Sequence, residues 1–278
     1  DGTDWRRHRT LFHPGFDTKT GLWQLTGSPF LFFDEEEDRW YIYFNYMAFN
    51  GIRPWDTPCL LRRAGAKETG MAGIRGDFEF PGEIVAPSGI AHPTDAEASS
   101  ISPPFKAADG KWYAFLGGGP KPFDENSGRW WVLIVKADSP GGPFTYIPGY
   151  APVPIMDPTG YVENPLPMKL TGPQTGKEYW AIIFNYLRGE VTTGMNSEIG
   201  FSSSSDGLTW REQDVQIIDL REGLPGDREE WWRAVRVPHQ LTDEGGGIYS
   251  CFFSAYDKHG EFEGIGKATF RLREVIPE

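Results

Sequence analysis

Two charged residues stand at matching positions of a repeated sequence phrase and could together bind the hydroxyl groups of a substrate. Glu163 lies two residues before Pro165, and Arg236 lies two residues before Pro238. If both segments begin innermost strands in a ring of sheets, the two side chains face a central channel. A carboxylate and a guanidinium can there bind each other and substrate hydroxyls. The alternative is a structural ion pair that joins neighbouring sheets.

A second acidic group precedes another copy of this phrase, in the loop 92–97. Asp95 and Glu97 are two residues apart, so they point to the same side of an extended chain. Either one facing Glu163 would make a carboxylate pair, which suits glycoside hydrolysis because one carboxyl protonates the leaving oxygen while the other activates water. His92 begins this loop and is a candidate substrate-binding residue. The alternative is a loop whose charges only face solvent.

Three further polar residues are candidates for binding substrate. Asn164 directly follows Glu163, and Asp17 could reach the channel mouth. His239 follows Pro238 and could bind a metal ion or a substrate hydroxyl, although a hydrogen-bonded core histidine explains it equally well.

Tryptophans that lie outside clean strand alternation could supply the apolar half of a sugar site. An indole face stacks on the apolar face of a sugar ring, while its N–H serves a hydroxyl. The best candidate for a subsite wall is the pair 231–232, just ahead of Arg233 and Arg236. Taken singly, each tryptophan is more simply explained by packing. The residues concerned are Trp23, Trp55, Trp231 and Trp232.

The strands that must position these residues are indicated by a sequence phrase that recurs four times. Each copy has a proline-introduced apolar strand, an acidic or glycine-rich turn, and an aromatic strand. The prolines recur every 60 to 75 residues or so, a period typical of radially repeated blades. The four prolines that anchor the phrase are Pro29, Pro103, Pro165 and Pro238.

The strand pattern predicts an all-β protein, a single β-propeller domain over residues 1–278. We expect four units of three or four strands each. Their first strands are expected at 30–34, 101–106, 165–170 and 235–241. Residues 1–27, with a possible strand near 5–12, could contribute to a fifth blade, close the ring or line the channel mouth. Five blades are favoured over four.

The charge and composition of the chain narrow the classes of molecule that it can bind. The formal net charge of −12 argues against nucleic acid and anionic membrane surfaces, and favours a small-molecule or oligosaccharide substrate. No run of residues approaches transmembrane length. The two cysteines, Cys59 and Cys251, could form one bridge or stay as buried thiols. The start at Asp1, without Met or an apolar leader, slightly favours secretion over the cytoplasm. The sequence leaves the oligomeric state open.

Three passages resemble the five-bladed propeller glycosidases, broadly glycoside hydrolase family 43 and its relatives. The strand-turn-strand at 105–113 is similar to that group's phrase, as is the outer-strand passage at 135–144. The segment 162–165 resembles the one that carries the general acid. The turn 202–210 resembles the Ser-x-Asp-Gly-x-x-Trp turn of many carbohydrate-active propellers, which we expect to be structural.

The resemblance implies an inverting enzyme with an Asp base in the first blade, a Glu acid and a second Asp that tunes the acid. Glu163 matches the acid, and Asp95 matches the tuning Asp only with a shifted register. The first blade departs from the pattern, because Gly27-Ser28-Pro29 stands where an Asp-Pro is expected. Asp17 and Glu97 are the substitutes for the missing base.

The leading hypothesis is therefore a glycoside hydrolase acting on a neutral or plant-type oligosaccharide. The alternatives are a carbohydrate-binding propeller without catalysis, and a lyase or transferase on the same scaffold. Motifs of serine hydrolases, zinc proteases and phosphate-binding loops are absent. No cofactor is required by this reading, although it leaves room for a channel calcium ion.

Overall fold

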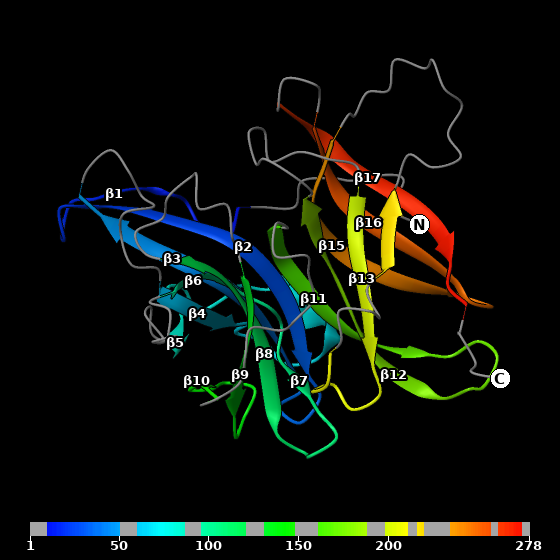
Figure 1. The fold of residues 1–278 in the computed structure, drawn as a ribbon. Coiled ribbons are helices and arrows are strands. Elements are labelled where there is room, and N and C mark those ends of the chain that lie inside the picture. The colour runs from blue at the N-terminus through cyan, green and yellow to red at the C-terminus, as the bar shows by residue number, and fades with distance from the viewer. Residues whose placement is uncertain are drawn as a thin grey trace. The chain divides into compact units, whose positions relative to one another are not determined.

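The structure, a computed structural model, describes residues 10–50, 60–86, 96–120, 131–147, 161–187, 198–210, 216–219, 234–256 and 261–273. These residues form antiparallel sheets and one short 3-10 helix, Met71–Arg75 (Figure 1). None of the helices in this part of the chain has the length and apolarity needed to cross a membrane. The expected all-β class is confirmed.

Four sheets follow one another along the chain, and we number them in that order. The first contains β1 (Gly15–Asp17), β2 (Leu22–Asp34), β3 (Arg39–Phe49), β4 (Leu60–Gly65) and β5 (Glu83–Ala86), paired in sequence order. The second contains β6 (Ala96–Ile101), β7 (Phe105–Lys106), β8 (Trp112–Pro120), β9 (Trp131–Ala137) and β10 (Thr145–Tyr146). The third contains β11 (Tyr161–Thr171), β12 (Glu178–Leu187), β13 (Glu198–Ser204) and β14 (Gln216–Asp219). The fourth contains β15 (Ala234–Gly245), β16 (Ile248–Tyr256) and β17 (Phe262–Arg271).

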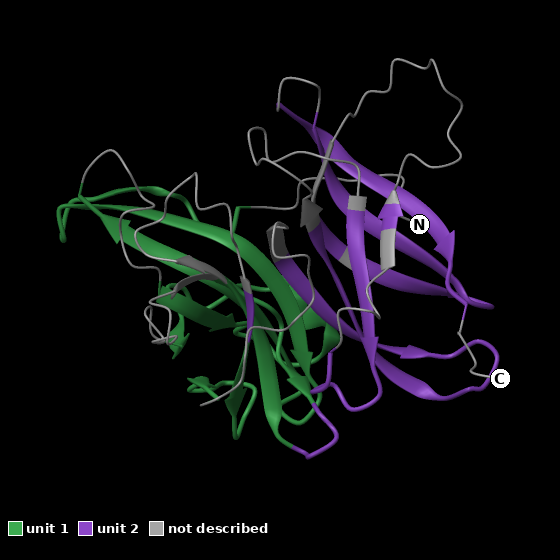
Figure 2. Cartoon of the chain, in the orientation of Figure 1, with its two compact units in different colours: residues 1–106, 111–121, 134–150 green, residues 107–110, 122–133, 151–278 purple. Residues whose placement is uncertain are grey.

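The chain divides into two compact units (Figure 2). One unit comprises residues 1–106, 111–121 and 134–150, and holds the first sheet and most of the second. The other comprises residues 107–110, 122–133 and 151–278, and holds the third and fourth sheets.

The four sheets correspond to the four copies of the sequence phrase and to the blades of a propeller. The described residues thus form four such sheets, and not the five that we favoured. Residues 15–17 and 22–27, which we considered for a fifth blade, belong to the first sheet. Of the strand expected near 5–12, residues 10–12 form no strand and the others lie outside the described residues.

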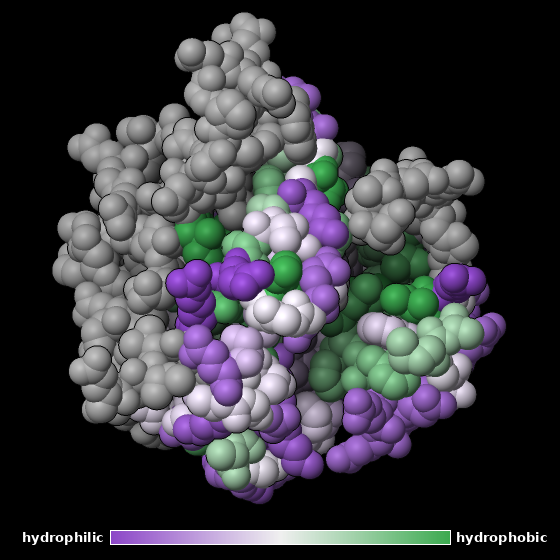
Figure 3. Space-filling view, turned by 90° about the vertical axis from the view of Figure 1, so that its right-hand side faces the viewer, coloured by the Kyte–Doolittle hydropathy of each residue, from purple (hydrophilic) through white to green (hydrophobic). Residues whose placement is uncertain are grey.

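Burial of side chains on both faces of its central strand stabilises the first sheet. Along β3 the side chains are buried on both faces, as expected for a strand in the middle of a sheet that is covered on both sides. One face forms a buried cluster of Ile42, Phe44, Tyr46, Ala64, Ala66 and Phe78. At the other extreme, exposure alternates along most of β17. The face of the molecule drawn in Figure 3 shows hydrophilic and hydrophobic residues next to one another.

The Asp206 turn after β13 is structural, as expected. The Asp206 carboxylate accepts hydrogen bonds from the backbone N–H groups of Leu208 (2.8 Å) and Thr209 (2.7 Å) and from the Ser204 hydroxyl (2.8 Å). Partial burial works to raise the pKa of Asp206, but these hydrogen bonds outweigh it and lower the pKa to about 2. Trp210 is buried and donates its indole N–H to the Gly207 carbonyl, so the turn is fixed to the sheet.

Candidate functional site

The inner strands share a backbone irregularity where the repeated phrase has its proline. In the first, third and fourth sheets the pairing register shifts directly after the residue two before the proline. Proline has no backbone N–H to donate to the ladder, which is consistent with an irregularity of this kind beside it. The residues at the shift, with their partners on the next strand, are Gly27 with Asn45, Glu163 with Asn185, and Arg236 with Ser254.

The second sheet differs from the other three. Its register shift falls between Ala98 and Ser100, ahead of the corresponding position, and Ile101 pairs with Leu116. Ile101 is fully buried and apolar, so this inner position contributes no polar chemistry.

The first and third sheets are close copies at this irregularity. The residues before their prolines, Ser28 and Asn164, both have positive φ, 46° and 53°. Asn164 is buried, and asparagine is one of the few non-glycine residues that tolerate this conformation well. The shared backbone makes Gly27 of the first sheet equivalent to Glu163 of the third.

A buried asparagine stands opposite each of these positions. Asn45 and Asn185 are the central residues of two Phe-Asn-Tyr triplets, and both are buried. Sequence reasoning missed this pair of asparagines, although the repeated triplet was a signal that could have found them. A buried amide beside a channel position can orient a carboxyl or bind a hydroxyl.

The Asn45 side chain packs closely against Gly27 in the first sheet. A Cβ added at Gly27 would lie 2.9 Å from Asn45 Oδ1, closer than real Cβ contacts come. The side chain of Asn45 thus occupies the space that a side chain at position 27 would need. A side chain at position 27 would therefore require the Asn45 amide to move.

The fourth sheet adds a histidine held by a serine. His239 Nε2 lies 2.8 Å from Ser254 Oγ, and Ser254 is the residue opposite Arg236. Burial of part of the ring lowers the pKa of His239, which favours the neutral imidazole near pH 7. The residue nevertheless remains partly exposed to solvent. It can therefore offer a ring nitrogen to a ligand while the other is engaged by Ser254.

Asp17 is part of a turn in the first sheet. Its carboxylate accepts hydrogen bonds from Lys19 N (2.9 Å), Thr20 Oγ1 (2.9 Å) and Gln24 Nε2 (3.0 Å). The backbone bond from Lys19 and the hydroxyl bond from Thr20 lower the pKa of Asp17, so the carboxylate is a weaker proton acceptor than usual.

The remaining candidates are described only in part. Asp95, His92 and Trp232 lie outside the described residues. Glu97, Glu163 and Arg236 have described backbones, in β6, β11 and β15, but their side chains lie outside the described part. Within the second unit, β11 and β15 pack against each other, which brings together the strands that carry Glu163 and Arg236 (Figure 1).

Metal and disulfide chemistry find no support in the described part of the chain. Its residues contain no group of three or more His, Cys, Asp or Glu side chains that could hold a metal ion. Cys251 is a free, fully buried thiol, and burial raises its pKa to about 12. The bridge to Cys59 is therefore not formed.

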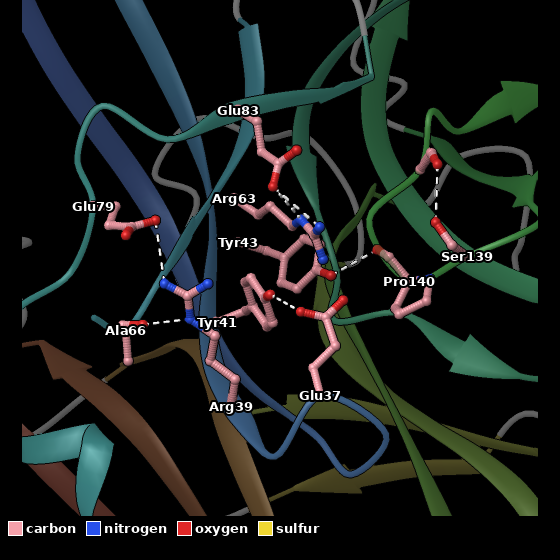
Figure 4. A network of polar contacts seen from close by, with 11 residues as sticks. Glu37, Arg39, Tyr41, Tyr43, Arg63, Ala66, Glu79, Glu83, Ser139 and Pro140 are labelled. Carbon is pink, nitrogen blue, oxygen red and sulfur yellow. Dashed lines mark hydrogen bonds and ion pairs between the residues drawn. The ribbon is translucent and has the colours of Figure 1, made fainter. Parts of the chain in front are cut away.

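A second cluster of charged residues, in the first unit, holds sheets together (Figure 4). The Arg63 guanidinium stacks 4.3 Å from the Tyr41 ring centroid and pairs with Glu83 at 3.0 Å. The Tyr43 hydroxyl donates to the Pro140 carbonyl at 2.7 Å, in the turn between β9 and β10. A Cβ at Gly141 of that turn would lie 2.4 Å from Arg63 Nη2. Packing this tight leaves no space for a ligand, so we assign the cluster a structural role.

Comparisons with known proteins identify the fold. The sequence matches no protein-family model, and no curated protein matches it. Among solved structures, it is similar to a family-43 β-1,3-galactosidase with galactodeoxynojirimycin, at 14% identity and a TM-score of 0.54 over 88% of this chain and 73% of the other. A thermostable family-43 glycoside hydrolase gives 17% identity and a TM-score of 0.54 over 88% and 69%. The β-fructofuranosidase of Schwanniomyces occidentalis, complexed with fructosyl-erythritol, gives 12% identity and a TM-score of 0.53 over 90% and 44%.

The fold is that of the glycoside hydrolase β-propellers. The resemblance inferred from the sequence is confirmed at this level. Its neighbours include more than one family of glycoside hydrolases.

Proposed function

We propose that this protein is a glycoside hydrolase acting on a neutral or plant-type oligosaccharide, with Glu163 as general acid. The observation that carries the proposal is the register shift of β11 directly after Glu163. It puts an acidic residue at the inner-strand position that Gly27 holds in the first sheet, in a fold shared with glycoside hydrolases.

In the proposed reaction, Glu163 gives its proton to the glycosidic oxygen as the bond from that oxygen to the anomeric carbon breaks. Water attacks the same carbon and loses a proton to a second carboxylate. Asp95 and Glu97 are the proposed bases, and Arg236 is the proposed substrate clamp. Asp17 is a poorer base, because its turn hydrogen bonds lower its pKa. His239, held by Ser254, is a proposed hydroxyl ligand.

One observation favours a second candidate, a carbohydrate-binding propeller without catalysis. The first sheet has Gly27 and the Asn45 side chain where the resemblance implies a catalytic Asp. A binding protein needs no base at this position, whereas a hydrolase must take its base from elsewhere.

The replacement Glu163→Gln tests the proposal. Loss of the general acid should lower turnover of oligosaccharides about 100- to 10,000-fold and leave substrate binding intact. The matched control is Glu178→Gln, a carboxylate of the same sheet that is 70% exposed and paired with Lys169. Turnover should be measured on oligosaccharides and aryl glycosides, and binding by calorimetry.

Unchanged turnover in the Glu163→Gln variant would remove this residue from the acid role. Binding of oligosaccharides by a wild-type protein that turns none of them over would favour the non-catalytic alternative.

A further inference from the structure

An exposed row of aromatic rings crosses the first sheet. Phe16, Trp23 and Phe49 lie directly opposite one another on β1, β2 and β3, and we name these three residues the aromatic row. Directly opposite residues share one face of a sheet. Phe16 is 52% exposed and Trp23 is 49% exposed, while Phe49 is half-buried. Folding does not require large rings to be left in water, so the row needs another explanation.

Contacts within the sheet hold two rings of the row and the turn that joins their strands. The ring centroids of Phe16 and Trp23 are 5.6 Å apart with an interplanar angle of 62°, an edge-to-face pair. The turn between β1 and β2 is closed by the Asp17 hydrogen bonds to Lys19, Thr20 and Gln24. Asp17 and Gln24 lie one position along the strands from Phe16 and Trp23, and so belong to the opposite face. A ligand on the row would therefore lose little free energy in ordering it.

The chemistry of the row suits a sugar ring. An edge-to-face pair leaves ring faces available for stacking on an apolar sugar face. The indole N–H of Trp23 makes no hydrogen bond to any described residue, so it can serve a hydroxyl. Three rings cover far less area than the roughly 800 Å² per partner of a stable protein interface, which argues against a protein partner.

The row lies on the same sheet face as the Gly27–Asn45 pair. Along β2 and β3 the row is followed on that face by Leu25 with Met47, and then by Gly27 with Asn45. The four residues from Trp23 to Gly27 span about 13 Å of strand, which exceeds one sugar ring. A sugar on the row is therefore separate from one at the inner-strand position.

We propose that the aromatic row is a remote subsite that stacks a neutral sugar unit of an oligosaccharide, away from the bond that is cleaved. The proposal rests on the proposed function for its substrate class. It makes the protein selective for chains of several sugars over single-sugar aryl glycosides.

The test compares Trp23→Ala with Leu31→Ala. Leu31 is also 49% exposed on β2, but it lies outside the row. The probes are neutral xylo-, galacto-, arabino- and manno-oligosaccharides of two to six units, together with the aryl monoglycosides. Calorimetry gives affinities, and initial rates give kcat and KM separately.

Trp23→Ala should weaken binding and raise KM about fivefold to tenfold for the longest probe that wild type binds, with kcat and the aryl monoglycosides unaffected. Trp23→Phe should retain most of the affinity, and Leu31→Ala should match wild type. Equal losses for disaccharide and hexasaccharide, or equal behaviour of Trp23→Ala and Leu31→Ala, would overturn the subsite, as would failure of wild type to bind any probe. Unfolding midpoints of all three variants show whether each is folded.

The two proposals fail in different ways. Hydrolysis that depends on Glu163 but not on Trp23 rejects the subsite alone. Binding that depends on Trp23, in a protein that hydrolyses none of the probes, rejects the hydrolase and retains the subsite.

Discussion

The first and third sheets show the same backbone device with different residues. Both inner strands shift register two residues before a proline, both have a positive φ before that proline, and both face a buried asparagine. The first has Gly27 at the shift, whereas the third has Glu163. The repeat therefore supplies a position in the backbone, and each sheet separately determines whether a side chain with chemistry fills it.

Among the variants that test this comparison, a replacement of Gly27 should cause the largest loss of stability. Gly27→Ala puts a Cβ 2.9 Å from Asn45 Oδ1, so we expect a loss of about 2 kcal/mol in the free energy of unfolding. Adding Asn45→Gly should restore part of it. Glu163→Ala, at the equivalent position of the third sheet, should change stability by less than about 0.5 kcal/mol. Urea denaturation measures all of these.

Two results would change the comparison. A tolerated Gly27→Ala would show that Asn45 can move, and that sterics do not exclude an acid there. A large loss in Glu163→Ala would support the structural ion pair with Arg236 instead of a catalytic acid.

The next largest losses of stability should come from the turn carboxylates, Asp206 in the third sheet and Asp17 in the first. Asp206→Ala should cost about 1–2 kcal/mol because its backbone donors lose their acceptor beside buried Trp210. Asp17→Ala should have a smaller effect, since two of its three hydrogen bonds are exposed to water and no buried tryptophan lies in its turn. Asp206→Asn keeps one acceptor oxygen and is the control.

The free energy of unfolding, measured as a function of pH in the acid range, tests the Asp206 prediction. The folded pKa of Asp206 is about 2, below the ordinary 3.8, so its contribution is fully present above pH 3.8 and is lost as pH falls through about 2. Wild type and Asp206→Asn should therefore converge at low pH. A difference that is constant with pH would show that the carboxylate charge is not what stabilises the turn.

The smallest effect should come from the positive-φ residues. Ser28→Gly should stabilise the protein by about 0.5 kcal/mol, because relief of the left-handed conformation exceeds the added entropy of the unfolded chain. Asn164→Gly should be neutral or slightly destabilising, since asparagine already tolerates this conformation. Thermal unfolding of both variants gives the comparison. An equal response would mean that residue type at the shift is immaterial.

Much of this fold could be predicted from the repeated phrase, because an apolar run, a turn and an aromatic run are local signals. The register shifts were not predicted, although in three of the four sheets they lie beside the proline of the phrase. The start of the first inner strand at Leu22 was missed, because residues 22–27 mix polar and aromatic side chains without clear alternation. The pairing of Gly27 with Asn45 could not be predicted, because it depends on which residue of the next strand lies opposite.

The candidate site was predicted less completely than the fold. Glu163 and Arg236 were chosen because they share the proline offset. The strands that carry them lie together, and the roles of the two side chains stay predictions. Asp17 was chosen by its position near the start of the chain, which says nothing about its turn hydrogen bonds. Trp23 was among the tryptophans expected to stack on a sugar, but its alignment with Phe16 and Phe49 could not be predicted because the three rings come from three strands.

The contact between the Tyr43 hydroxyl and the Pro140 carbonyl bears on how the chain folds. The two residues are 97 positions apart, and Arg63 fits against Gly141 in the same place. A nascent chain that has only completed the first sheet still exposes Tyr43 and Arg63. The hydrogen bond of Tyr43 therefore forms only after the turn of the second sheet has been synthesised, so the first sheet alone lacks one of the contacts that hold its inner strands.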